Sequence, residues 1–156
     1  MTAQSTEPVP FVRQAGEGQT HNVLGVTHVY KAMTTETGGA FSIWEAIIPP
    51  GHGAPPHTHG REDEAFYVLS GELTLELEGE PVRAGPGAFF FGRRGRRHGF
   101  RNTTHQDVRA LILSTPGAGL ERMFGELDAA SAAGMPPMET IMAITARADV
   151  AIAAPA

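Results

Sequence analysis

Hydrophobic and polar residues alternate along most of this chain, in short runs that end at Gly or Pro. Leu73, Leu75 and Leu77 are each followed by a polar residue. This period of two is typical of a strand with one buried face. We interpret the following residues as strands: 23–33, 41–48, 65–69, 73–77, 81–85, 88–91 and 108–114. The chain has 19 Gly and 12 Pro in 156 residues, which supply the many turns that short strands need.

The spacing of apolar residues changes after residue 117. Leu120, Met123, Phe124 and Leu127 lie three or four positions apart, as they do on the buried face of a helix. A second group, at residues 138, 141, 142 and 144, predicts another helix. We therefore expect a flexible lead-in over residues 1–20, a strand-rich domain over 21–116, and a helical segment over 117–156. The helical segment should pack on the strands and cover one open end of that domain.

Composition narrows the classes of protein that this chain can be. Its net charge is −5 and its pI is about 5.8, so no overall positive field attracts nucleic acid or acidic membranes. The polar N-terminus lacks the apolar core of a signal peptide, and no run of about 18 apolar residues predicts a membrane span. We expect a cytoplasmic protein. Because Cys is absent, imidazole and carboxylate are the only strong metal donors available.

Three of these donors are spaced so that they can converge. His57 and His59 are two residues apart, so on an extended strand both imidazoles point to the same side. If the chain turns back after Gly60, Glu64 on the next strand can face the same point. His98 is the candidate for a fourth ligand. Three imidazoles and one carboxylate suit one divalent transition metal ion, which can be Fe, Mn, Ni, Co, Cu or Zn.

The spacing of these residues resembles a known family. The string Gly51-x5-His57-x-His59-x4-Glu64-x6-Gly71 is similar to the first cupin motif at every fixed position. Residues 87–102 resemble the second motif, which the chain matches at Gly87, Gly95, His98 and Asn102. Arg93 stands where the family usually has Pro, which loosens a turn without touching a ligand. The resemblance implies an all-β fold, a double-stranded β-helix (the cupin jelly-roll barrel) with short C-terminal helices, and a metal ion held by His57, His59, Glu64 and His98.

The resemblance also implies functions. Residues 61–69, 83–87 and 120–124 look like the single-domain cupins related to quercetin dioxygenases, which implies a metal-dependent dioxygenase acting on a flavonol-like or other enolisable aromatic molecule. Polyketide-cyclase cupins, which use Zn and no oxygen, are the alternative. A small-molecule-binding cupin without turnover is the third possibility. Glu64 can serve both as a ligand and as a catalytic proton acceptor. We expect Phe66, Val68 and Phe100 to form an apolar substrate pocket beside the metal.

The remaining residues of interest have plainer interpretations. His21 and His28 are expected at the surface or the edge of the core, and His52 outside the metal shell. Trp44 can pack in a subunit interface or line a pocket, and packing is the preferred interpretation. The arginines between Arg93 and Arg101 predict a solvated loop, with recruitment of an anionic substrate or an acidic partner as the alternative.

The expected partners are a small-molecule substrate and a second copy of the chain. A second copy is expected because a swapped strand over 23–33 would protect an exposed sheet edge. We expect no nucleic-acid partner and no membrane.

Overall fold

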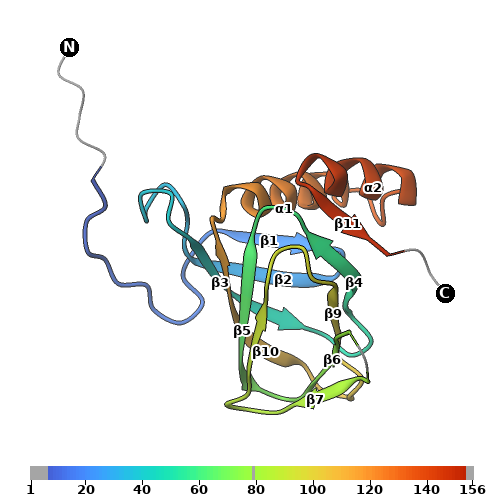
Figure 1. Ribbon diagram of the computed structural model, residues 1–156. Helices are drawn as coiled ribbons and strands as arrows, with labels where there is room; N and C mark the ends of the chain where they lie inside the picture. The colour runs from blue at the N-terminus through green and yellow to red at the C-terminus, as the bar shows by residue number, and fades with distance from the viewer. Residues whose placement is uncertain (1–6, 79, 154–156) are drawn as a thin grey trace.

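The computed structural model describes residues 7–78 and 80–153. It contains short strands followed by two helices and a final strand (Figure 1). In chain order the elements are β1 (Thr20–Val23), β2 (Val26–Ala32), β3 (Ser42–Ile48), β4 (Gly53–His59), β5 (Asp63–Ser70), β6 (Leu73–Glu76), β7 (Val82–Ala84), β8 (Phe89–Gly92), β9 (His98–Arg101), β10 (Val108–Thr115), α1 (Ala118–Ala130), α2 (Met138–Arg147) and β11 (Val150–Ile152).

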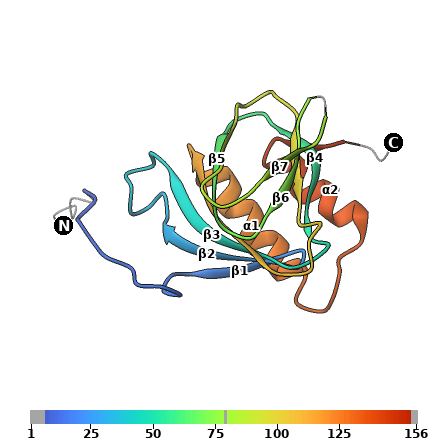
Figure 2. The same ribbon diagram turned by 90° about the horizontal axis from the view of Figure 1, so that it is seen from below.

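The strands form two antiparallel sheets that together make the barrel. One sheet has the order β1-β2-β3-β10-β5-β8, and the other has the order β11-β4-β9-β6-β7. Strands that follow one another in sequence often lie in different sheets, as β4 and β5 do, and this is the winding of a double-stranded β-helix. The predicted all-β fold is confirmed. Figure 2 looks into the strands from below, with α1 and α2 beyond them.

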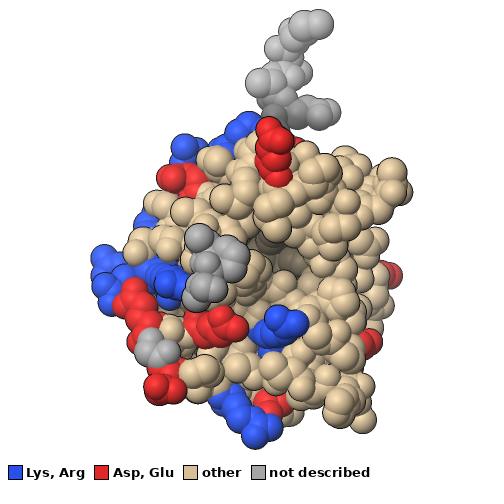
Figure 3. All heavy atoms as spheres, turned by 90° about the vertical axis from the view of Figure 1, so that its right-hand side faces the viewer, with Lys and Arg blue, Asp and Glu red and all other residues tan. Residues whose placement is uncertain are grey.

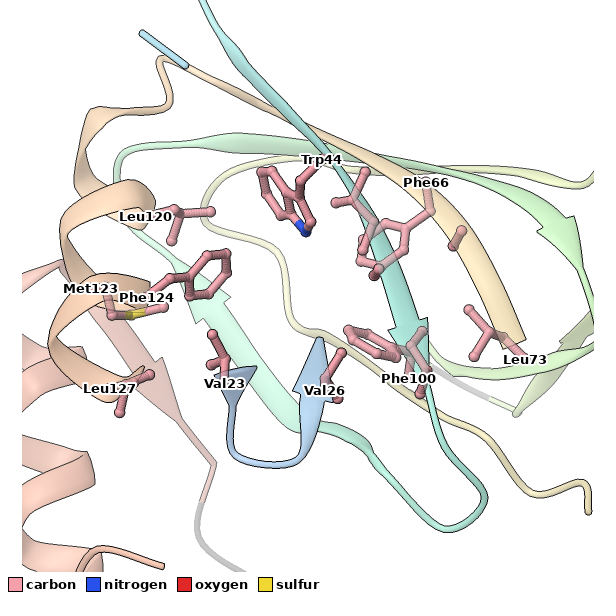
Figure 4. Packing of buried hydrophobic residues seen from close by; sticks show 14 of the residues in the cluster. Val23, Val26, Trp44, Phe66, Leu73, Phe100, Leu120, Met123, Phe124 and Leu127 are labelled. Carbon is pink, nitrogen blue, oxygen red and sulfur yellow. The ribbon is translucent and has the colours of Figure 1, made fainter. Parts of the chain in front are cut away.

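The inner face of the barrel follows the alternation of the sequence. On β3, Ser42, Trp44, Ala46 and Ile48 are fully buried, while the residues between them are half-buried. β3 pairs with β10 so that Trp44 lies opposite Ile112, and β10 in turn places Ile112 opposite Phe66 of β5. Large apolar side chains from several strands therefore meet in one layer and form the core (Figure 4).

The expected strand over residues 23–33 is wrong in its extent. The chain forms a hairpin there, because β1 ends at Val23 and β2 begins at Val26. The two residues of the turn, Leu24 and Gly25, have φ of 50° and 90°. Gly takes up this left-handed conformation easily, and such turns match the twist of two antiparallel strands. Residues 7–19 precede this hairpin without a helix or strand, and the expected lead-in otherwise includes residues 1–6, which lie outside the described part.

The segment after residue 117 contains both predicted helices and one strand that was not predicted. Leu120, Met123, Phe124 and Leu127 are buried on α1, as their spacing predicted. On α2, Ile141 and Ile144 are buried, whereas the methionines at positions 138 and 142 are exposed. Strand β11 returns to the barrel and pairs with β4. Both helices lie across one end of the strands (Figure 1).

Asn102 fixes the turn that follows β9. Its side chain is fully buried and donates to the carbonyl oxygens of Ile48 at 2.8 Å and Gln106 at 2.7 Å. Its Oδ1 accepts from the backbone N–H of Thr104 at 2.9 Å and from the Thr104 hydroxyl at 2.7 Å. One amide thus ties two connecting segments together at the end of the barrel opposite the helices.

Within residues 7–78 and 80–153, no helix has the length and apolar character required to cross a bilayer.

Candidate metal centre and adjoining cavity

Four buried side chains from three strands converge inside the barrel. They are His57 and His59 of β4, Glu64 of β5 and His98 of β9. Each offers one ligand atom, and these atoms all lie within 4.8 Å of one another. Nε2 of His57 lies 2.9 Å from Nε2 of His59, and Oε2 of Glu64 lies 3.2 Å from Nε2 of His98 and 3.4 Å from Nε2 of His59. The structure therefore brings together every residue that the sequence proposed as a ligand.

Backbone carbonyls orient two of the imidazoles. Nδ1 of His57 donates to the carbonyl oxygen of Pro55 at 2.8 Å, and Nδ1 of His98 donates to that of Arg96 at 3.2 Å. A carbonyl oxygen can only accept, so these contacts place the proton of each neutral ring on Nδ1. The unprotonated Nε2 then faces the centre of the cluster, in the tautomer that a metal ligand requires.

The charges of the cluster are set by burial and by Glu64. Burial lowers the pKa of His57 to about 4. Burial opposes the charge of Glu64, but hydrogen bonds from His59 and His98 outweigh it and hold the Glu64 pKa well below its usual range. Burial also opposes protonation of His59, yet the contact with Glu64 outweighs it and raises the pKa of His59. The carboxylate is thus ionised, and its contacts with His59 and His98 stabilise the negative charge.

The donor set fits a divalent cation. Two Nε2 lone pairs that face each other at 2.9 Å repel unless a proton or a cation lies between them. Three imidazoles and a carboxylate, all within 4.8 Å, supply four ligands of the type that transition metals prefer. Metal ligands have to be deprotonated, so binding of a cation should release any protons that the cluster holds. The buried cluster therefore suits a divalent transition metal ion.

The surroundings of β4 hold its two imidazoles in place. β4 lies between β9 and β11, which pair His57 with His98 and His59 with Val150. The N–H of Gly95, in the arginine-rich loop, donates to the carbonyl oxygen of His59 at 2.7 Å. Gly92 leaves the space that the His98 ring needs, since a Cβ at this position would lie 3.0 Å from Cε1 of His98.

A largely apolar cavity of about 110 Å³ adjoins the cluster. His57, His59 and Glu64 form part of its wall, and residues of β1–β4, β9, β10, the two helices and β11 form the rest. The partly exposed residues Leu24, Gly53, Ala54 and Ile152 mark its mouth. Figure 3, which faces the side of the molecule where β4 and β11 lie, shows a hollow bordered mostly by uncharged residues. The helices thus close one end of the barrel and shape the space beside the cluster.

The expected pocket residues occupy two different places. Phe100 lines the cavity. Phe66 and Val68 are buried in the core and do not line it, which corrects that part of the expectation. Phe66 packs against Phe100 and Phe90, with ring centroids 5.2 and 5.6 Å apart. Alternation placed both residues on the inner face with Glu64, but it could not show that neighbouring aromatic rings fill the barrel at their level.

Two further residues, His28 and Trp44, belong to the cavity wall. His28 is buried, with 5% of its surface exposed, and Trp44 is fully buried. Both line the cavity. The expectation for His28, the surface or the edge of the core, is therefore wrong. Trp44 packs in the interior and also lines the cavity, which was the second interpretation of this residue. The signal for His28 lay in its position on an apolar strand, where a histidine on the inner face has to be buried.

The other histidines and the arginines lie away from the cluster. Within the described residues, the cluster of potential ligands does not include His21, which contacts Asp128 at 3.0 Å, or His52. The five arginines between residues 93 and 101 are exposed. Two of them form ion pairs: Arg94 with Asp63 at 2.9 Å and Arg96 with Glu78 at 2.6 Å. This loop is thus a charged outer surface that the fold uses to anchor β5.

A β-helical barrel with three imidazoles and a carboxylate in its interior defines a class of small metal-site proteins. Comparison with known families and proteins is consistent with that class. Residues 44–114 match the model of the Cupin domain. Quercetin 2,3-dioxygenase of Bacillus subtilis (strain 168) is 29% identical over 109 residues, which are 70% of this chain and 32% of that protein. The protein is a member of the cupin superfamily.

Other relatives have names that refer to different chemistry. Polyketide synthase CurC of Streptomyces cyaneus is 34% identical over 88 residues, which are 54% of this chain and 56% of that protein. The structure of the polyketide cyclase RemF from Streptomyces resistomycificus has a TM-score of 0.62 and 25% identity, and the match covers 69% of this chain and 80% of that one. The chain spans only 32% and 56% of the length of these two curated relatives, the dioxygenase and CurC.

Proposed function

We propose that the protein is a metal-dependent enzyme that acts on a small enolisable or aromatic molecule, with oxygen-dependent cleavage as the leading reaction. One observation carries this proposal: His57, His59 and Glu64 belong both to the ligand cluster and to the wall of an apolar cavity. A structural metal site usually has a closed shell within the protein. A cluster that opens onto a cavity is arranged to meet a ligand.

The residues of the chain have distinct roles in this proposal. His57, His59, Glu64 and His98 would hold the ion, which when bound supplies Lewis acidity or redox chemistry to a substrate oxygen. Glu64 lies in the cavity wall, and its carboxylate, if released from the ion, would be a base within reach of the proton that an enol or phenol loses. Phe100 and the apolar wall exclude water and favour a flat ring.

The alternative is a Zn-dependent cyclase or isomerase that consumes no oxygen. The similarity to the polyketide cyclase RemF and to CurC supports this alternative. The same cavity and the same carboxylate serve both reactions, because each begins with removal of a proton from an enolisable carbon or hydroxyl group. A cupin that binds its ligand without turnover is the third candidate. Fold alone does not choose among the three.

Metal analysis tests the site. The purified protein should contain about one divalent transition metal ion per chain, and His59→Ala and Glu64→Ala should each lower that content strongly. His105→Ala, which replaces an exposed histidine outside the cluster, is the matched control and should keep the full content. Unchanged metal in both cluster variants would contradict the assignment.

Oxygen uptake then separates the reactions. With Fe, Mn, Ni, Co or Cu loaded, an oxygen electrode should record substrate-dependent uptake with flavonols or smaller enolisable aromatics. Turnover with Zn and no oxygen uptake would favour the cyclase. Ligand binding without any product, in all metal forms, would leave the non-catalytic candidate.

We also infer a homodimer, joined through the outer face of β8. β8 is an edge strand of its sheet, and it exposes Phe89 and Phe91 at 67% and 55% beside Tyr67 and Leu69 of β5 at 46% and 40%. If β8 of one chain pairs with β8 of a second chain about a two-fold axis, the exposed apolar side chains of the two chains come together. Light scattering after size exclusion should give the mass of two chains, and Phe89→Glu should give one. A monomeric wild-type protein at micromolar concentration would refute this inference.

A further inference from the structure

Glu62 is a buried carboxylate that lies outside the ligand cluster. It stands in the turn between β4 and β5, and only 2% of its surface is exposed. Its Oε2 is fully shielded from solvent and has no hydrogen-bond partner among the described residues. A buried acceptor without a hydrogen bond costs free energy, and Glu is seldom buried unless it is paired. Such a side chain calls for a donor close by.

His59 can supply that donor. Its Nε2 faces the cluster, 2.9 Å from Nε2 of His57. An ion ligated there takes the lone pair of Nε2, so the proton of the neutral ring has to lie on Nδ1. Nδ1 of His57 and Nδ1 of His98 each meet a carbonyl oxygen. Nδ1 of His59 is fully shielded from solvent and meets no acceptor in the described part of the chain, so its proton still needs one.

Sequence and charge both place the carboxylate of Glu62 close to His59. Only two residues of a turn separate them, so their Cα atoms cannot lie more than about 11 Å apart. Burial raises the pKa of Glu62, and His59 is the first of the charges that oppose this rise, ahead of Arg61 and Arg94. Burial opposes protonation of His59, and Glu62 acts against burial there, after Glu64. Because such attraction weakens with distance, the two side chains are near neighbours.

The first turn of α1 holds the carboxylate of Glu62 in place. A Cβ on Gly119 would lie 2.3 Å from Oε1 and 3.8 Å from Oε2, so this Gly leaves the space that Oε1 needs, and Oε2 lies farther from the helix. The positive end of the helix dipole lies at this turn and favours a carboxylate. The N-cap residue, Gly117, has no side-chain hydrogen bond, so capping of α1 does not account for Glu62.

We propose that Glu62 is a positioning residue of the metal centre, and that its Oε2 accepts the Nδ1–H of His59 while Nε2 of that ring holds the ion. A ligating imidazole usually donates its other N–H to a carboxylate or a carbonyl oxygen, which fixes the ring and makes it a stronger ligand. The contact also ties α1, which helps to close the cavity, to the strand that carries two ligands. This inference rests on the proposal that the cluster binds a metal ion.

Competition with a chelator for Zn²⁺ measures the contribution of Glu62. Glu62→Leu should bind Zn²⁺ about 10-fold to 100-fold more weakly than the wild type, which is the usual effect of losing such a partner. Glu62→Gln keeps an acceptor oxygen and should recover much of the affinity. Glu121→Leu is the matched control, because Glu121 lies in the same first turn of α1 but contacts Thr34. It should bind Zn²⁺ like the wild type.

Gly119→Ala moves the carboxylate of Glu62 without changing its chemistry. The added Cβ would displace Oε1, which is at the end of a flexible side chain, so the protein should still fold and should bind Zn²⁺ more weakly. Gly125→Ala is the control in the same helix, because a Cβ there would have no neighbour nearer than 3.7 Å. It should keep the wild-type affinity.

The ring signals of His59 separate positioning from a general loss of stability. In long-range ¹H–¹⁵N NMR spectra of the Zn²⁺-loaded protein, the His59 ring should carry its proton on Nδ1. Glu62→Leu should shift these signals and leave those of His57 and His98 in place. Unchanged Zn²⁺ affinity in Glu62→Leu, or weaker binding without a change at the His59 ring, would overturn the inference.

Failure of the metal function can be told apart from failure of this inference. A wild-type protein that binds no Zn²⁺ would count against the metal function. The same NMR comparison, made without Zn²⁺, then decides whether the contact exists. A shift of the His59 ring signals in Glu62→Leu would support the contact, and identical signals would overturn it.

Discussion

Lowering the pH should destabilise this protein through His28. The imidazole is buried and neutral, and its pKa is lowered to about 3, whereas a histidine in an unfolded chain has a pKa of about 6.5. Between these two values the unfolded chain binds a proton that the folded protein does not. The free energy of unfolding therefore falls as the pH falls below about 6.5, and this contribution levels off near the folded pKa.

The magnitude follows from the two pKa values. Each pH unit below the unfolded pKa is worth about 1.4 kcal/mol. From pH 7 to pH 5, His28 should thus remove about 2 kcal/mol of stability, and the full range down to the folded pKa corresponds to an upper bound of about 5 kcal/mol. A loss of 2 kcal/mol is a large part of the 5–15 kcal/mol that roughly describes the stability of a small domain.

Urea unfolding at pH 7, 6 and 5, in the presence of a chelator, measures this effect. The wild-type protein should lose about 2 kcal/mol more over this range than His28→Gln, in which position 28 cannot titrate. Other buried histidines, His57 among them, are present in both proteins and cancel in the comparison. His105→Gln removes an exposed histidine and should keep the wild-type pH dependence. Parallel losses in the wild type and His28→Gln would refute the reasoning.

Three further changes should give measurable effects. Asn102→Ala leaves four hydrogen-bonding groups without their partner and should cost about 2–4 kcal/mol in urea unfolding. Gly117→Ala, at the N-cap of α1, would put a Cβ 2.6 Å from the backbone nitrogen of Ser42 and should cost about 1–3 kcal/mol. Gly125→Ala, inside α1, would put a Cβ no closer than 3.7 Å to its neighbours and should stabilise by about 0.5–1 kcal/mol. Zn²⁺ at 100 times its Kd should add about 2.7 kcal/mol and raise the Tm by roughly 5–10 °C, and this rise should vanish in His59→Ala.

Three of the four ligands were predictable because their geometry is local, whereas His98, on β9, was identified by the resemblance to the second cupin motif. Side chains that are two residues apart on a strand point to the same side, whatever the rest of the chain does. The imidazoles of His57 and His59 therefore had to converge. Glu64 follows after one tight turn. The same alternation predicted the strands of the barrel. The spacing of three or four residues predicted the buried face of α1. These parts of the fold depend on periods of two and of about 3.6 residues, which the sequence displays directly.

The cavity was not predictable in the same way. Alternation placed Phe66 on the inner face, but whether an inward side chain meets the cavity or another ring depends on packing between strands far apart in sequence. His28 reaches the cavity only because a hairpin sets β2 beside β3. Strand β11 was missed because Val150–Ile152 is too short to display a period. These features arise from contacts between residues that lie far apart in sequence.

Strand β11 also affects when the site can exist during synthesis. Ile152 pairs with His57. The cavity wall includes Val23, on the first strand along the chain, and Ile152, on the last strand that the structure describes. A nascent chain whose last strand is still inside the ribosome lacks the neighbour that flanks the ligand-bearing strand. Domains fold as their residues emerge, so capture of an ion or a substrate should follow completion of the barrel and cannot guide its early assembly.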